Sequence, residues 1–165
     1  MNKRIIHYPE YVGLVQDICR QITLSNWHPE YVVGITRGGL LPAVLISQYF
    51  DIPMQSLDVS LRDHTMTVSN CGMSEDAYAN KNILVVDDIN DSGATLNWIM
   101  NDWQDSCLPN DDRWNFVWGN NVKFAVLVDN AGSECKADMD FVGFEINKLE
   151  QDVWIEFPYE DWWKK

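Results

Sequence analysis

The chain has 165 residues, of which 46% are hydrophobic, and it carries a formal net charge of −13 at pH 7. This length and composition are typical of one globular domain with its own core and exclude an intrinsically disordered chain. The negative charge excludes nucleic acid as the main partner, because binding to a phosphate backbone requires a basic surface. No apolar run is long enough to cross a bilayer and the first residues lead into no signal-peptide core, so we expect a cytoplasmic protein with no membrane partner.

Apolar residues follow helical and strand periods in turn along the chain. Helices are expected from Pro9 to about residue 25, after residue 39 with Pro42 in the first turn, and from about Gly93. Strands are expected at residues 31–35, 54–61, 83–86, 122–128, 141–146 and 153–157. Strands that alternate with helices imply right-handed crossovers and a mainly parallel twisted sheet flanked by helices. We therefore expect an α/β fold in one domain that spans residues 1–165.

Two segments lack a clear period. Residues 62–80 are polar and small, which predicts a mobile loop. Residues 105–121 are rich in Asp, Asn and Trp, and we expect them to form an excursion on the surface.

Ligands of parallel sheets bind beyond the carboxyl ends of the strands, where strand–turn–helix junctions collect. One such junction is expected at Arg37 and a second at residues 87–95. At the second, Asp87 and Asp88 follow a buried strand, Asp91 comes three residues later, and residues 92–95 open a helix. Free N–H groups and hydroxyls at a helix start bind phosphate, whereas the carboxylates beside them suit sugar hydroxyls or a divalent cation. The pattern therefore predicts a phosphorylated sugar as the ligand.

Residues 85–95, VVDDINDSGAT, resemble the ribose-phosphate signature of the type I phosphoribosyltransferases. Within that family they are most similar to the purine salvage enzymes, in particular the bacterial xanthine-guanine phosphoribosyltransferases. Three further segments agree with the family in order and spacing. ITRGGLLP at residues 35–42 is similar to its pyrophosphate loop, DVS at residues 58–60 to the start of its flexible lid, and QDVWIEFP at residues 151–158 to the C-terminal piece whose aromatic residue stacks on the purine.

The resemblance implies transfer of the phosphoribosyl group from 5-phosphoribosyl-1-pyrophosphate (PRPP) to a ring nitrogen of a purine-like base, with release of pyrophosphate and with Mg²⁺ as cofactor. It also implies a flexible lid over residues 60–80, a small base-binding hood over about residues 129–165, and a homodimer or homotetramer. Family members have a cis peptide in the pyrophosphate loop, which implies one between Thr36 and Arg37.

Carried over position by position, the resemblance gives each part of the substrates its residues. Asp91 would be the catalytic general acid or base near N7 of the purine, and Asp87 and Asp88 would hold the ribose hydroxyls and help to place Mg²⁺. The whole PRPP site would comprise Asp87, Asp88, Asp91, Ser92, Gly93, Ala94 and Thr95. Pyrophosphate would bind Thr36, Arg37, Gly38 and Gly39, the lid would contribute Ser60 and Arg62, and the base would contact Trp154, Ile155 and Asp129.

The chain departs from the family pattern at two places that bear on the substrate. Enzymes that use 6-oxopurines carry a lysine where this chain has Asp129, and a carboxylate suits an amino group better than a carbonyl oxygen. Another lysine could take over that task, the candidates being Lys123, Lys136 and Lys148. The lid lacks the tyrosine that follows its serine in the family, although Arg62 could still cover pyrophosphate.

Other interpretations of the same residues stay open at this point. The acidic pair also fits a response-regulator receiver domain or a purely structural turn, although the pair lies in mid-chain here. Arg37 could be a surface arginine, and Trp154 could be part of the core. The chain could also be a binding module that senses PRPP without catalysis.

Overall fold

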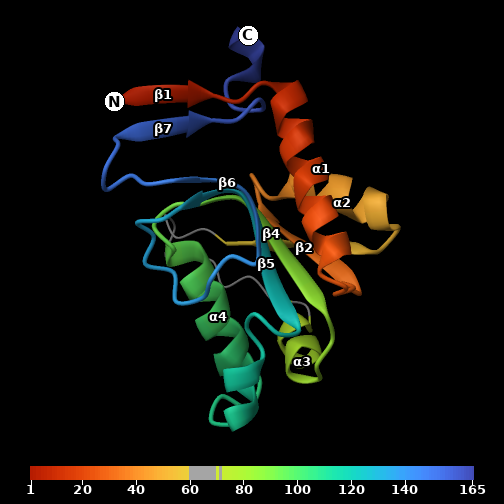
Figure 1. The fold of residues 1–165 in the computed structure, drawn as a ribbon. Coiled ribbons are helices and arrows are strands. Elements are labelled where there is room, and N and C mark those ends of the chain that lie inside the picture. The colour runs from red at the N-terminus through yellow and green to blue at the C-terminus, as the bar shows by residue number, and fades with distance from the viewer. Residues whose placement is uncertain (60–69, 71) are drawn as a thin grey trace.

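A five-stranded parallel sheet forms the centre of the molecule in the computed structural model, which describes residues 1–59, 70 and 72–165 (Figure 1). Its strand order is β3-β2-β4-β5-β6, and every neighbouring pair is parallel. The strands are β2 (Tyr31–Thr36), β3 (Met54–Asp58), β4 (Ile83–Asn90), β5 (Val122–Asn130) and β6 (Phe141–Ile146). The prediction of an α/β fold with a mainly parallel sheet is confirmed.

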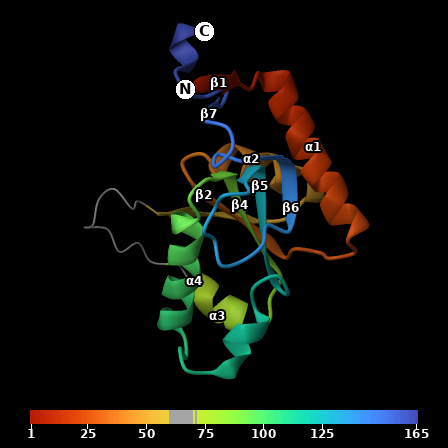
Figure 2. The ribbon, with the colours of Figure 1, turned by 60° about the vertical axis from the view of Figure 1, so that its left-hand side comes forward.

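Helices cover both faces of this sheet (Figures 1 and 2). They are α1 (Tyr8–Leu24), α2 (Leu40–Phe50), α3 (Met73–Tyr78) and α4 (Ala94–Ser106). Apolar side chains of α1 and α2 share one core with Leu84 and Val86 of the central strand, and those of α3 and α4 share a second core with Ile83 and Val85. This division follows from the alternation of side chains along a strand. None of the described helices is long and apolar enough to cross a membrane.

A small second sheet stands apart from the main one and joins the two ends of the chain (Figure 1). It pairs β1 (Asn2–Ile5) with β7 (Val153–Glu156) in parallel. Every side chain of β1 is exposed, so no apolar pattern could have predicted this strand. Glu156, which is buried, forms ion pairs with Lys3 and Lys165 and ties the sheet to the C-terminus.

The predicted hood over about residues 129–165 has different bounds in the structure. β6 is the edge strand of the main sheet, because it pairs with β5 and places Phe141 in the core. The part that stands apart is the β1–β7 sheet with the short 3-10 helix η2 (Trp162–Lys164). From here on, the hood means the β1–β7 sheet together with η2 and the turn between them, so it includes an N-terminal strand.

The central strand is longer than its apolar run. The sequence predicts a strand at residues 83–86 followed by an acidic turn, but β4 continues through both aspartates to Asn90. Its partner β5 runs in register with it, pairing Asp87 with Val126 and Asn90 with Asp129. Backbone pairing to a long buried neighbour overrides the low strand propensity of aspartate.

The prediction of a mobile loop at residues 62–80 is wrong for its second half, which contains α3. Met73 and Ala77 are fully buried in the second core, and the Ser74 hydroxyl donates a hydrogen bond to the carbonyl of Trp103. A helix of six residues carries too few apolar positions to show a period, and its contacts with α4 stabilise it. The expected lid residues Ser60 and Arg62 lie outside the described residues.

Residues 105–121 are also more than a surface excursion. They contain the 3-10 helix η1 (Asp112–Phe116), whose Trp114 is 2% exposed. The Trp114 indole donates to the carbonyl of Cys107 at 2.8 Å. Trp118 stacks on Trp114 and on Phe124 of β5, with ring centroids 5.9 and 6.0 Å apart. This segment is therefore part of the second core, where it packs against the start of β5.

We predict that Trp114→Ala lowers the free energy of unfolding by about 3–5 kcal/mol, because it removes a large buried aromatic side chain from the core. The matched control is Phe116→Ala in the same 3-10 helix, whose side chain is 71% exposed and whose loss should cost less than about 1 kcal/mol. Urea unfolding of both variants measures the difference. Equal losses would mean that the segment is not part of the core.

Candidate functional site

The carboxyl ends of β2, β4 and β5 meet at one edge of the main sheet, as they must in a parallel arrangement. A cavity of about 210 Å³ lies at this edge and is lined by residues 87–96. The structure thus brings together the two strand–turn–helix junctions that the sequence predicts. They are the loop after β2 and the segment that joins β4 to α4.

Two adjacent carboxylates, Asp87 and Asp88, end the buried part of β4. The N–H group of Asp88 donates to Asp87 Oδ1 at 2.9 Å, and that of Ile89 donates to Asp88 Oδ1 at 2.8 Å. Burial raises the pKa of Asp87 well above its ordinary value, and repulsion from Asp88 raises it further. Two carboxylates this close repel each other, and a strongly shifted pKa of this kind is typical of functional sites.

The loop after β2 lies directly against this acidic pair. The peptide between Thr36 and Arg37 is cis, as the family resemblance implies. Thr36 donates through its hydroxyl to Asp58 at 2.8 Å, and the Arg37 side chain is exposed. A side chain at Gly38 would place its Cβ 2.0 Å from the Asp88 carboxylate, and one at Gly39 would place it 2.3 Å from the carbonyl of Val86. Only glycine allows the loop this approach to the acids.

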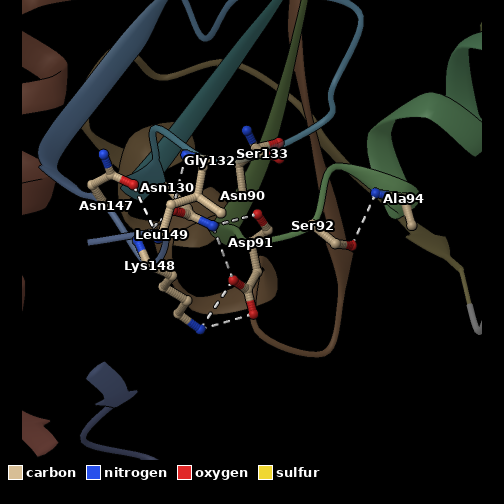
Figure 3. Close-up of polar contacts among 10 residues, drawn as sticks. All are labelled: Asn90, Asp91, Ser92, Ala94, Asn130, Gly132, Ser133, Asn147, Lys148 and Leu149. Carbon is tan, nitrogen blue, oxygen red and sulfur yellow. Dashed lines mark hydrogen bonds and ion pairs between the residues drawn. The ribbon is translucent and has the colours of Figure 1, made fainter. Parts of the chain in front are cut away.

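The start of α4 forms a cradle of backbone N–H groups. Gly93 precedes the helix with a φ of 89°, and a Cβ there would lie 2.3 Å from the backbone nitrogen of Cys135. The Ser92 hydroxyl accepts a hydrogen bond from Ala94 N–H at 3.2 Å (Figure 3). Ser92 and Ala94 are exposed and Thr95 is half-buried, so the first turn of the helix is open to a ligand. Such a helix start binds phosphate through N–H groups and the positive end of the helix dipole.

Asp91 lies beside this cradle and contacts a lysine from the loop between β6 and β7. The Lys148 ammonium is 3.0 Å from each oxygen of the Asp91 carboxylate (Figure 3). Asn130, at the end of β5, donates to the backbone carbonyl of Asp91 at 2.9 Å and accepts from the N–H of Lys148 at 3.0 Å. One buried amide therefore fixes both partners of the ion pair.

Trp154 also lies close to this lysine. Its ring centroid is 5.7 Å from the Lys148 ammonium, and its side chain is 45% exposed. This exposure excludes the core-packing alternative for Trp154. The next residue, Ile155, is instead buried in the first core, and in β7 it pairs with Arg4 of β1.

Asp129, the residue at the expected lysine position, is in a neighbouring cavity of about 310 Å³. Its carboxylate accepts a hydrogen bond from Asn90 at 2.9 Å. Burial raises the pKa of Asp129, against the effect of this bond, and the nearby Glu145 raises it further. Asp129 is therefore not brought to Asp91 in the described structure, where Lys148 takes the adjacent position.

The three candidate lysines are separated clearly by the structure. The Lys123 ammonium lies 5.4 Å from the ring of Trp27, at the amino end of β5 and away from the cavity. Lys136 is exposed, and its N–H bonds to the side chain of Asn97. Of these three lysines, only Lys148 contacts Asp91. The sequence could not choose among them, because Lys148 lies in a loop whose path no sequence period predicts.

The acidic pair fits a magnesium ion only in combination with a substrate. Among the described residues no three His, Cys, Asp or Glu side chains converge on one point. Asp87 and Asp88 offer hard oxygen ligands, and their mutual repulsion would be relieved by a divalent cation. Magnesium sites with one or two carboxylates are completed by water and by substrate oxygens. The chain thus has half of such a site.

Comparison with known proteins shows the family of this chain. The model of the phosphoribosyl transferase domain matches residues 2–161. The chain belongs to this family. A xanthine-guanine phosphoribosyltransferase of Idiomarina loihiensis is 29% identical to it over 133 residues, which are 78% of this chain and 70% of that protein. One of Cereibacter sphaeroides is 29% identical over 136 residues, covering 78% and 68%.

Solved structures show the same fold. A purine phosphoribosyltransferase from Pyrococcus horikoshii matches with a TM-score of 0.69 and 22% identity, covering 96% of this chain and 94% of that one. A xanthine-guanine-hypoxanthine phosphoribosyltransferase from Helicobacter pylori matches with a TM-score of 0.68 and 21% identity, covering 99% and 95%. The matched share means that the fold is similar over nearly the whole chain, including the hood.

Two residues of this family member were not assigned to the site from its sequence. Asn130 is a lone amide after an apolar run, and its part in fixing Asp91 depends on contacts across 39 residues. Tyr159 follows the C-terminal segment, and its hydroxyl donates to Asp88. The only sequence signal for Tyr159 was its closeness to Trp154 and Pro158.

We predict that Asp87→Asn stabilises this phosphoribosyltransferase-family protein at pH 8. The pKa of Asp87 is higher in the folded protein than its ordinary value of 3.8, so at pH values above 3.8 the folded protein binds more protons than the unfolded one. The free energy of unfolding therefore falls as pH rises from about 4 through the folded-state pKa. The amide cannot ionise, and its advantage should fade as pH falls to about 4. Thermal unfolding measures this, since about 1 kcal/mol shifts Tm by roughly 2–4 °C in a chain of this size.

The control for this measurement is Asp105→Asn, which changes an exposed carboxylate on α4 and should leave the pH profile unaltered. A lower Tm for Asp87→Asn at pH 8, or an advantage independent of pH, would contradict the strain assigned to the acidic pair.

Proposed function

We propose that the protein transfers the phosphoribosyl group of PRPP to a ring nitrogen of a 6-oxopurine and releases pyrophosphate. The observation that carries this proposal is the junction of β4 and α4, where an acidic pair, a carboxylate with a lysine partner and an open helix start line one cavity. The family and the names of its relatives, which are xanthine and guanine phosphoribosyltransferases, support the same reaction.

The 5-phosphate, the ribose and the pyrophosphate of PRPP would each bind a different segment of the chain. Its 5-phosphate would accept hydrogen bonds from the N–H groups and hydroxyls of residues 92–95. Its ribose hydroxyls would donate to Asp87 and Asp88, and its pyrophosphate would lie on the loop of residues 36–39, where Arg37 supplies a guanidinium. The local devices explain how a chain with a net charge of −13 can take an anionic substrate.

Mg²⁺ belongs to this proposal as the cation that the acidic pair would hold together with PRPP oxygens. When bound, it would neutralise the departing pyrophosphate. The aspartates would keep the sugar and the leaving group in place, so that much of the rate enhancement would come from positioning.

Asp91 would receive the proton. A ring nitrogen of the base would form a bond to C1 of the ribose while the bond from C1 to the pyrophosphate oxygen breaks, and pyrophosphate would leave with the electron pair. The imidazole ring of the purine must then lose its proton, and the Asp91 carboxylate is the base held at this edge of the cavity by Asn130 and Lys148.

Lys148 would select the base. The O6 and N7 atoms of a 6-oxopurine are neighbouring acceptors, whereas adenine has a donor amino group at position 6. An ammonium that is close to both the Asp91 carboxylate and the exposed Trp154 ring would donate to O6 of a purine stacked on that ring. Lys148 would thus perform the task of the lysine that Asp129 replaces.

Several expectations from the resemblance stay predictions. They are the lid with Ser60 and Arg62, the contact of Ile155 and Asp129 with the base, the homodimer or homotetramer, and the cytoplasmic location. None of them is needed for the chemistry proposed here.

We predict that Asp91→Asn lowers kcat by roughly 10²–10⁴, the usual range for a general acid–base group, while PRPP still binds. Pyrophosphate release with guanine, xanthine or hypoxanthine measures the rate, and calorimetry measures PRPP binding. The control is Asp112→Asn, an exposed carboxylate in η1. Unchanged turnover would remove Asp91 from the mechanism. Tight PRPP binding by the wild type without pyrophosphate release with any base would favour a sensor.

We predict that Lys148→Met lowers kcat/KM for 6-oxopurines by roughly 10–100-fold, because a hydrogen bond to a charged donor contributes about 1.5–3 kcal/mol. The preference for hypoxanthine over adenine should fall with it. Lys123→Met is the matched control, since that ammonium lies at the far end of β5. Steady-state kinetics with both bases give the ratio, and an unaltered ratio in Lys148→Met would exclude Lys148 from base selection.

A further inference from the structure

Tyr159 reaches from the C-terminal segment to the acidic pair. Its hydroxyl donates a hydrogen bond to Asp88 Oδ2, across 71 residues of sequence. The other oxygen of this carboxylate accepts from the N–H of Ile89 at 2.8 Å. Both oxygens of Asp88 are therefore fixed, one by its own strand and one by a segment that belongs to the hood.

This hydrogen bond lies where the acidic pair, the pyrophosphate loop and the segment after Trp154 come together. Asp88 Oδ2 is also the atom that a side chain at Gly38 would strike first, so it faces the pyrophosphate loop. Five residues before Tyr159 is Trp154, the proposed platform for the base. One hydroxyl thus joins the base-binding segment to the carboxylate of the ribose and pyrophosphate end.

The Tyr159 ring is held rigidly enough to orient a partner. It stacks on Phe157 with centroids 5.8 Å apart and planes at 8°, and it meets Tyr11 of α1 edge-on at 6.1 Å. The turn that carries it is closed by Glu160 N–H donating to the Phe157 carbonyl at 3.0 Å and by the Lys165 ammonium donating to the same carbonyl at 3.1 Å.

The Tyr159 hydroxyl is the donor in this hydrogen bond, and the Asp88 carboxylate is the acceptor. A carboxylate that ligates a metal or sugar is commonly oriented by such an outer partner, and loss of the partner typically costs 10–100-fold in metal affinity or activity.

We propose that Tyr159 is a positioning residue for PRPP and its magnesium ion, which it serves by holding the Asp88 carboxylate against the pyrophosphate loop. This inference rests on the proposed function. It adds a residue outside the ribose-phosphate signature and makes the hood a structural part of the donor site as well as of the base site.

The test compares two tyrosines of the same aromatic cluster. Tyr159→Phe removes only the hydroxyl that bonds to Asp88 and keeps the stacking on Phe157. Tyr11→Phe removes a buried hydroxyl that has no hydrogen-bond partner among the described residues, and its ring packs edge-on against both Phe157 and Tyr159. The pair therefore separates loss of the bond to Asp88 from a general change in the cluster.

Calorimetric titration of each protein with PRPP, at several Mg²⁺ concentrations, is the measurement. We expect Tyr159→Phe to raise the Kd of PRPP about tenfold or more and to raise the Mg²⁺ concentration for half-maximal binding. KM for PRPP should rise more than kcat falls, and the Tm of the free protein should stay close to that of the wild type. Tyr11→Phe should bind PRPP as the wild type does.

The outcomes separate the two proposals. If the wild type failed to bind PRPP with Mg²⁺, the proposed function itself would be overturned, and this inference with it. If the wild type bound PRPP and Tyr159→Phe bound it equally well or more tightly, with the same Mg²⁺ dependence, only the positioning role would be overturned. An equal loss in Tyr159→Phe and Tyr11→Phe would overturn it too, because the aromatic cluster would then act as a whole.

Discussion

Repulsion between two adjacent, partly buried carboxylates is the constraint on which the site depends. They follow the buried part of the central strand β4, and burial together with repulsion from Asp88 raises the pKa of Asp87. Their oxygens are held by backbone N–H groups and by one tyrosine hydroxyl, which fix direction without removing the charge. In the proposed function, sugar hydroxyls and a divalent cation would relieve this repulsion, so that ligand binding would offset a cost in stability.

The rest of the junction follows from bringing an anion close to these acids. A phosphate cannot approach a carboxylate unless positive or donor groups separate them, and the helix start at Gly93 provides those groups within a few residues. The loop after β2 packs directly against the strand that carries the acids, and it can do so because Gly38 and Gly39 have no side chains. Lys148 forms its ion pair with Asp91.

The hood is tied to this chemistry from both ends of the chain. Pairing of β1 with β7 and the ion pairs of buried Glu156 fix the segment that carries Trp154. The residues that follow this segment place Tyr159 against the acidic pair, where its hydroxyl donates a hydrogen bond to Asp88. The segment that carries Trp154 and the strand that carries the acids are consequently parts of one packed unit, although they are far apart in sequence.

Periodicity alone determined how the five strands of the main sheet and helices α1, α2 and α4 follow one another along the chain, because buried strands in such folds are nearly continuous apolar runs. The signature of residues 85–95 also determined the candidate acids and the phosphate cradle, since these residues are neighbours in the chain. Tertiary structure decided what depends on distant contacts: the extension of β4 through the aspartates, the exposed strand β1, the burial of Trp114, and the choice of Lys148 over Lys123 and Lys136. A loop lysine or a lone tyrosine has no period, so only the folded chain shows what it contacts.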